Sequence, residues 1–113
     1  MKKVRFPLRG EIFWVNLDPT MGTEINKKRP AIVISNNIAN EFSPRVIVAP
    51  ITSKASKIFP FEVGLVVKEK QGKILLDQIR AVDKVRLVSK MTSCDITTIV
   101  EIDKALKKVL ALV

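Results

Sequence analysis

The stretch FEVGLVV at residues 61–67 places an apolar side chain at every second position, at Phe61, Val63, Leu65 and Val67. Successive side chains of a β-strand point to opposite faces of the sheet. Alternation of this kind is therefore typical of a strand with one face buried and the other toward solvent. The stretch predicts a sheet that is covered on one side.

Further strand-like runs lie on both sides of this stretch. Each is short and rich in β-branched or aromatic residues, and turn residues separate the runs. The expected strands are residues 11–17, 29–35, 46–51, 73–82 and 86–91. The expected connections are a turn at Gly72, a turn over residues 83–85, a polar and basic loop over 52–60, and a polar segment over 36–44 that has room for a helical turn.

The hydrophobic period changes near the C-terminus. Apolar residues from Ile99 to Val113 recur at spacings of three, four and seven, which places them on one face of a helix. Thr98 and Glu101 have the spacing of a capping box at the start of that helix. Short strands followed by one helix predict a mainly β fold with a C-terminal α-helix, built as a small, strongly bent barrel.

The length and the charge of the chain limit its partners. A chain of 113 residues predicts one domain, spanning residues 1–113. Twenty Lys and Arg against eleven Asp and Glu give a formal net charge of +9. A positive field attracts polyanions, although a lysine-rich surface can also serve solubility alone. Because Lys27, Lys28 and Arg29 are consecutive, we favour a surface that binds a polyanionic partner. Membrane binding is disfavoured, because the one amphipathic segment ends apolar rather than basic.

The numbers of cysteines and histidines limit the disulfides and metal sites that the chain can form. Cys94 is the only cysteine, which excludes an internal disulfide, and no uncharged apolar run reaches the roughly 18 residues of a membrane span. Both features favour the cytoplasm. The chain has no histidine, and one cysteine alone cannot build a zinc site. Asp77 and Asp83 stand apart, and no Gly-rich phosphate loop occurs, so we expect no metal ion and no cofactor.

Four blocks of the sequence follow one another in a characteristic order. They are EIFWVNL with GTE at residues 11–17 and 22–24, RPAIVISN at 29–36, VAPITS at 48–53, and LDQIRAVDKVRL at 76–87. Together they resemble the MazF/PemK family of toxins from about Arg9 to Leu112. The resemblance implies an SH3-like barrel of the CcdB/PemK type that forms homodimers. It also implies a sequence-specific, metal-independent endoribonuclease, an mRNA interferase, which belongs to a type II toxin–antitoxin pair.

The chemistry of RNA cleavage fits this resemblance. RNA carries its own nucleophile, the 2′-OH, so an enzyme has to align it with the leaving 5′-oxygen and stabilise charge on the phosphoryl oxygens. Attack by the 2′-OH leaves a 2′,3′-cyclic phosphate and a 5′-OH. Arginine suits the stabilising task, because its permanently charged fork matches phosphate. Arg29 opens a strand directly after a loop, and the resemblance places the family's catalytic arginine there.

Thr52 is the second catalytic candidate, just beyond the third expected strand. Its hydroxyl can bind a phosphate oxygen, although a threonine at this place also suits the cap of a turn. The resemblance places the family's catalytic threonine or serine at this position. Ser53 is expected to assist it.

The general base is less well defined. Glu24 and Asp77 are the carboxylate candidates. In one branch of the family, an aspartate at the position of Asp77 is thought to act with an arginine two residues earlier, but that position is Leu75 here. Ile25 and Asn26 also stand where many members have Gln and Gly. A salt bridge to a nearby Lys or Arg is an equally good interpretation of both carboxylates.

A second set of residues is expected to contact RNA: Lys27, Lys28, Ser53, Lys54, Gln78 and Arg80. Gln78 and Arg80 are expected two residues apart on one strand and therefore on the same face. Trp14 can stack on an unpaired base or pack in the core, and core packing is the favoured interpretation. Cys94 is expected to be a buried bystander.

Two other functions fit a small basic barrel. A gyrase-poisoning toxin like CcdB shares the barrel, but that group has a tryptophan close to its last residue, and Trp14 is the only tryptophan here. A non-catalytic nucleic-acid-binding barrel would bind RNA without cutting it. As partners we expect single-stranded RNA, a second copy of the chain, and an acidic antitoxin protein whose disordered tail occupies the RNA path.

Overall fold

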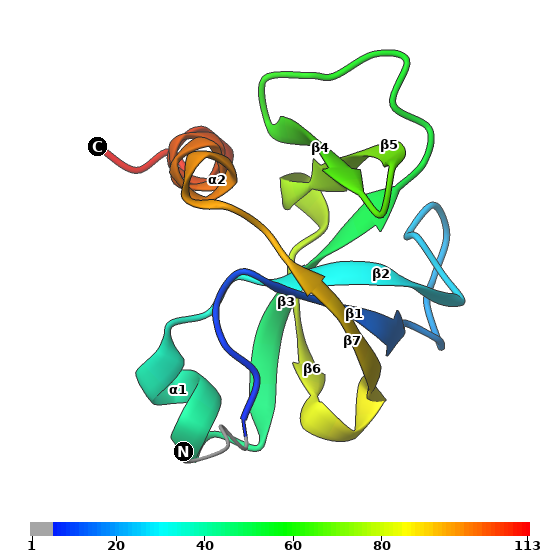
Figure 1. Ribbon diagram of the computed structural model, residues 1–113, viewed down its shortest axis with the longest axis vertical. Coiled ribbons are helices and arrows are strands. Elements are labelled where there is room, and N and C mark those ends of the chain that lie inside the picture. The colour runs from blue at the N-terminus through cyan, green and yellow to red at the C-terminus, as the bar shows by residue number, and fades with distance from the viewer. Residues whose placement is uncertain (1–5) are drawn as a thin grey trace.

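In the computed structural model, which describes residues 6–113, the strands form one strongly curled sheet and the longer helix packs beside it (Figure 1). The elements in chain order are β1 (Glu11–Asn16), β2 (Lys28–Val33), α1 (Asn37–Phe42), β3 (Arg45–Thr52), β4 (Glu62–Val67), β5 (Lys70–Leu75), the 3-10 turn η1 (Leu76–Gln78), β6 (Arg80–Asp83), the 3-10 turn η2 (Lys84–Arg86), β7 (Leu87–Ser93) and α2 (Ile96–Val109). The expected mainly β fold with a C-terminal helix is confirmed. No helix within residues 6–113 is long and apolar enough to cross a membrane.

Strand β3 connects the two halves of the curled sheet, because it pairs with β2, β5 and β6. Hydrogen-bonded neighbours follow the order β4-β5-β3-β2-β1-β7, and β6 pairs with β3 as well. Residues 45–48 of β3 pair with β6, whereas Ile51 and Thr52 at its end pair with Ile74 and Lys73 of β5. The end of β3 is therefore the place where the two halves of the curled sheet meet.

Two apolar clusters cover the two faces of β2. Ile32 joins the cluster beneath α2, which contains the buried Ile102 and Ala105 of that helix. Ala31 and Val33 join a second cluster with residues of β1, β3 and β6. Burying a side chain as large as Ile32 stabilises the fold by about 1.5–3 kcal/mol. Because both faces are covered, the strand has an almost continuous apolar run instead of an alternating one.

Helix α2 begins earlier than expected. Asp95 is its N-cap, and a carboxylate oxygen accepts the backbone N–H of Thr98 at 2.9 Å and the Thr98 hydroxyl at 2.8 Å. These two hydrogen bonds lower the pKa of the Asp95 carboxyl below its usual value. The predicted capping box of Thr98 and Glu101 is wrong, because the charged carboxylate is a stronger acceptor than a hydroxyl. The helix ends at Val109, so residues 110–113 lie outside it.

Cys94, next to this cap, is half-buried rather than buried as expected. Burial, with a smaller contribution from the charge of Asp95, raises the pKa of its thiol. The thiol therefore stays protonated at neutral pH, which disfavours a nucleophilic role.

The expected strand over residues 73–82 is in fact two strands. Strand β5 ends at Leu75, the turn η1 follows with the fully buried Leu76, and β6 starts at Arg80. The break lets the chain leave the end of β3 and pair with its beginning, which a continuous strand could not do. The turn expected at Gly72 is also wrong: Lys68 and Glu69, both with positive φ, connect β4 to β5, and Gly72 is buried inside β5.

Two of the other expected connections contain short helical turns, in agreement with their polar sequences. The polar segment over residues 36–44 contains α1, whose N-cap Asn36 accepts the backbone N–H of Ala39 at 2.8 Å. The turn after β6 is η2, where the Asp83 carboxylate accepts the backbone N–H of Val85 at 3.0 Å.

Candidate active site

The first cavity, of about 630 Å³, lies beside the end of β3. Residues of β1, β2, β7 and the β4–β5 hairpin complete its wall. The lining contains five cationic side chains, and no Asp or Glu lines it; the cations are Lys28, Arg29, Lys68, Lys70 and Lys90. Thr52 and Ser53 line the same cavity. The sequence candidates Lys28, Arg29, Thr52 and Ser53 are thus brought together in a positively charged hollow suited to a polyanion.

Arg29 lies on β2 at the edge of this cavity and is half-buried. Its Nε donates a hydrogen bond to the backbone carbonyl of Asn26 at 2.9 Å. That bond uses one of the five N–H donors of the guanidinium and fixes the side chain to the preceding loop. A phosphate in the cavity would meet a cation that is already held in place.

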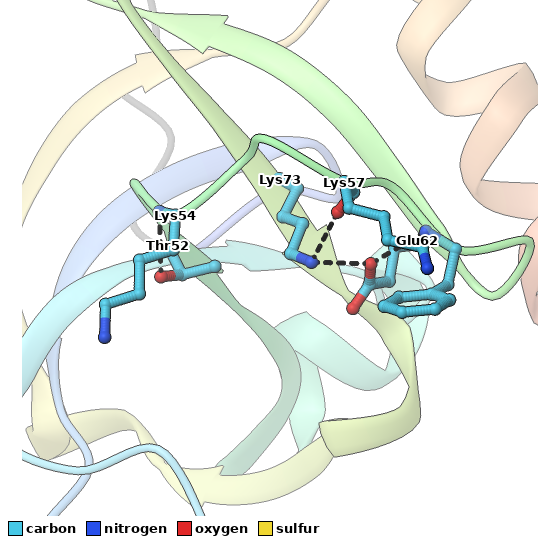
Figure 2. A network of polar contacts seen from close by, with 6 residues as sticks. Thr52, Lys54, Lys57, Glu62 and Lys73 are labelled. Atoms are coloured by element: carbon cyan, nitrogen blue, oxygen red, sulfur yellow. Dashed lines mark hydrogen bonds and ion pairs between the residues drawn. The ribbon is translucent and has the colours of Figure 1, made fainter.

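Thr52 is the last residue of β3 and is half-buried. Its Oγ1 accepts the backbone N–H of Lys54 at 3.3 Å, as Figure 2 shows. A hydroxyl that accepts this bond keeps its own proton for donation to another group. The backbone is held as well, because β5 comes so close that a Cβ added to Gly72 would lie 2.9 Å from the Thr52 carbonyl oxygen.

Trp14 forms part of the cavity wall, so the favoured interpretation of core packing is wrong. Its side chain is 41% exposed, whereas Ile12 and Val15 on the same strand are buried. The pairing of β1 with β7 shifts register on both sides of Trp14. The residues left without a partner are Val88 and Met91 of β7, and Met91 lines the same cavity as Trp14.

A second cavity, of about 440 Å³, collects the other sequence candidates. Glu24, Asp77, Gln78 and Arg80 line it, together with Pro50 of β3. Lys27 and Lys54 line neither cavity. The predicted residues therefore divide into a basic group around Thr52 and a mixed group around Asp77.

Gln78 and Arg80 do not share a strand face as expected, because Gln78 belongs to η1 and Arg80 begins β6. Both bind the loop between β1 and β2 instead. The Gln78 side-chain oxygen accepts the backbone N–H of Ile25 at 2.9 Å, and Arg80 Nη1 donates to the carbonyl of Leu17 at 2.9 Å. Their hydrogen bonds shape the loop that leads into Arg29.

Glu24 and Asp77 are both exposed. Glu24 Oε1 accepts the backbone N–H of Met21 at 2.5 Å, which closes a turn of the same loop. The ion pairs within residues 6–113 involve neither carboxylate, so the salt-bridge interpretation is wrong for the described chain. Within those residues, no group of three or more Cys, Asp or Glu stands close enough to hold a metal ion.

Several cavity residues escaped the sequence reasoning: Lys68, Lys70, Gln71, Ser89, Lys90 and Met91. They come from the β4–β5 hairpin and from β7, far in sequence from Arg29 and Thr52. Lys90 also pairs with Glu11 at 2.7 Å. The only local signal was the basic character of Lys68, Lys70 and Lys90, which did not distinguish them from other lysines of the chain.

Comparison with known proteins assigns a family to this fold and site. The sequence model of the PemK-like, MazF-like toxins of type II toxin–antitoxin systems matches residues 8–110. The chain belongs to this family. Endoribonuclease EndoA of Bacillus subtilis (strain 168) is 41% identical over 110 residues, which cover 93% of this toxin and 95% of EndoA.

Solved structures agree with the assignment. The crystal structure of MazF from Deinococcus radiodurans matches with a TM-score of 0.84 at 28% identity, over 96% of this toxin and 99% of that chain. A MazE–MazF crystal structure from the same organism matches with a TM-score of 0.78 at 26% identity, over 97% of this toxin and 100% of the matched chain.

Proposed function

We propose that this toxin is an endoribonuclease that cleaves single-stranded RNA in the cavity of Arg29 and Thr52. The observation that carries the proposal is the presence of both side chains in one cationic cavity. Family membership and the 41% identity to a protein named an endoribonuclease support it. A single-stranded chain can lay its phosphates along the cations and its bases on exposed aromatic surface.

In the proposed mechanism, the 2′-OH of the RNA attacks the adjacent phosphorus and the 5′-oxygen leaves. Arg29 stabilises the charge that grows on the phosphoryl oxygens, since its position is already fixed by Asn26. The Thr52 hydroxyl donates to one of the same oxygens, with Ser53 beside it. The products are a 2′,3′-cyclic phosphate and a 5′-OH, and no metal ion is required.

Glu24 and Asp77 are the proposed acid–base groups. They line the second cavity, and consecutive residues of β3 connect the two: Pro50 lines the second cavity, whereas Ile51 and Thr52 line the first. An RNA strand that crosses β3 at this point would meet both cavities. In that path the lysines at 27, 28 and 54 contact phosphates, and Gln78 and Arg80 contact bases at the second cavity.

The proposed partners follow from the same surface. A toxin that cuts cytoplasmic RNA has to be inhibited by another chain, and five cations around the cavity favour an acidic one. The MazE–MazF structure supports a protein antitoxin in this role. A homodimer would extend the shallow cavity of one subunit into a longer groove.

The direct test incubates the purified toxin with a long mixed-sequence RNA in EDTA, in magnesium, and beside single-stranded DNA of the same sequence. We expect discrete RNA fragments in both buffers and intact DNA. Binding without fragments in either buffer would indicate a non-catalytic barrel. Cleavage that EDTA abolishes and magnesium restores would contradict the proposed mechanism.

Replacing Gly72 by Ala is expected to slow cleavage roughly tenfold, because small misplacements of catalytic groups are costly. The new Cβ would lie 2.9 Å from the Thr52 carbonyl oxygen and 3.3 Å from Ile51 Cγ2. Backbone cannot yield as a flexible side chain can, so the end of β3 has to move. Single-turnover cleavage rates measure the effect.

The matched control is Gly64→Ala on the neighbouring strand. Its Cβ would crowd only the tip of the Ile58 side chain, at 2.6 Å, because the nearest backbone atom, the Gly72 carbonyl oxygen, is 4.0 Å away; Ile58 is 50% exposed and free to change rotamer. We expect cleavage within about twofold of the wild-type rate. Equal loss in both variants would show that the effect is general destabilisation.

Trp14→Ala is expected to weaken RNA binding by about 1–3 kcal/mol, since base stacking on an aromatic ring contributes that much per base. Trp14→Phe should retain most of the affinity. Trp14 is the only tryptophan, so quenching of its fluorescence on RNA addition reports the contact directly. Unchanged fluorescence and affinity would remove Trp14 from the RNA path.

A further inference from the structure

Lys73 and Glu62 form an ion pair with little exposed side-chain surface next to the cavity. Lys73 Nζ lies 2.8 Å from Glu62 Oε1, and the two side chains are only 12% and 6% exposed. No other ion pair within residues 6–113 has both side chains so little exposed. Lys73 lies directly opposite Thr52 in the pairing of β5 with β3.

The pair also forms two hydrogen bonds with the backbone of the loop over residues 53–61. Lys73 Nζ donates to the backbone carbonyl of Lys57 at 2.8 Å, and Glu62 Oε1 accepts the backbone N–H of Phe59 at 2.9 Å (Figure 2). The ring of Phe59 lies 5.4 Å from Lys73 Nζ and stacks on Phe61 at 5.6 Å. The loop is thus fastened to β4 and β5 through side chains.

The start of this loop sets the orientation of the Thr52 hydroxyl. The backbone N–H of Lys54 donates to Thr52 Oγ1 at 3.3 Å, which directs the hydroxyl proton elsewhere. A loop that moved at Lys57 and Phe59 would carry Lys54 with it. The hydroxyl would then lose the bond that orients it.

We propose that Lys73 and Glu62 are positioning residues, which fix the loop over residues 53–61 so that the Lys54 N–H orients the Thr52 hydroxyl toward the scissile phosphate. This inference rests on the proposed function and adds residues that touch no RNA. Replacing a buried ion pair by apolar residues often leaves stability unchanged or increases it. The role of this pair is therefore conformational, through the two backbone groups that it binds.

The experiment compares Lys73→Met, the double variant Lys73→Met/Glu62→Leu, and Lys73→Arg. Lys73→Met leaves Glu62 buried without its cation, whereas the double variant removes the charge pair and keeps apolar volume, so it folds even where the single variant does not. We expect kcat to fall roughly tenfold in the double variant with KM changed much less, and Lys73→Arg to retain most of kcat. Asp103→Asn, which breaks the distant pair with Arg9, is the control and should cleave normally.

Two readouts separate positioning from general stability. Amide hydrogen exchange at Lys54 and Phe59 should accelerate in the double variant, while exchange in α2 stays unchanged. In a Thr52→Val background, the double variant should cause little further loss of kcat, because residues that act as a unit are non-additive. Full kcat in the folded double variant, or an undiminished tenfold loss on top of Thr52→Val, would overturn the positioning role. A wild-type toxin that cuts no RNA would instead refute the proposed function.

Discussion

Arg29→Ala is expected to slow RNA cleavage by about two or more powers of ten, as removal of one preorganised charge stabiliser typically does. Arg29 is half-buried and lines a cavity that no carboxylate lines, and the remaining lysines cannot reproduce its planar fork on the phosphoryl oxygens. The loss should lie mainly in kcat. Single-turnover rates on a defined oligonucleotide measure it.

Two variants control for charge and for folding. Arg29→Lys keeps the charge without the fork and should recover only part of the rate. Lys28→Ala removes a cation from the same wall and should raise KM more than it lowers kcat, since it contributes to binding of the RNA path. An Arg29→Ala protein that is folded and turns over at a near-normal rate would show that the catalytic centre lies elsewhere.

Removing one 2′-OH from the substrate should abolish cleavage altogether. In the proposed mechanism this oxygen is the nucleophile, so a 2′-deoxy residue on the 5′ side of the scissile phosphate leaves nothing to attack the phosphorus. Binding should be almost unchanged, because the phosphates and bases remain. The measurement compares cleavage and affinity for oligonucleotides that carry one deoxy residue at that position or at its neighbour.

The neighbouring deoxy position is the matched control and should be cut at close to the normal rate. Cleavage of the substituted linkage at an undiminished rate would mean that water is the nucleophile. The roles given to Arg29 and Thr52 would then need a different chemistry.

Side-chain patterns predicted the positions of several strands, because the burial of one or both faces of a strand decides which of its residues are apolar. The alternation at residues 61–67 became β4, and the apolar run after Arg29 became β2. The sequence did not predict the break between β5 and β6, because both halves of residues 73–82 have strand-like side chains. The two strands are separate because they pair with opposite ends of β3. The hairpin turn at Lys68 and Glu69 was missed because neither residue favours positive φ.

The site was predictable only where its residues belong to recognisable blocks. Arg29 and Thr52 come from two such blocks, and the structure places them in one cavity. Trp14 was assigned to the core, whereas it lines a cavity whose other walls come from β2, β3, β7 and the β4–β5 hairpin, and that arrangement cannot be read from one strand. The ion pair of Lys73 and Glu62 gave no signal, since its burial depends on a loop that closes over it.

The chemistry of the new RNA ends shows whether the 2′-OH is the nucleophile. A long mixed-sequence RNA is digested with the toxin in EDTA, and the fragment ends are identified by mass spectrometry and by their response to a 5′-kinase. Attack by the 2′-OH predicts 2′,3′-cyclic phosphate ends and 5′-OH ends that accept phosphate without prior treatment. Fragments with 3′-OH and 5′-phosphate ends would contradict it, because attack by the 2′-OH cannot produce them.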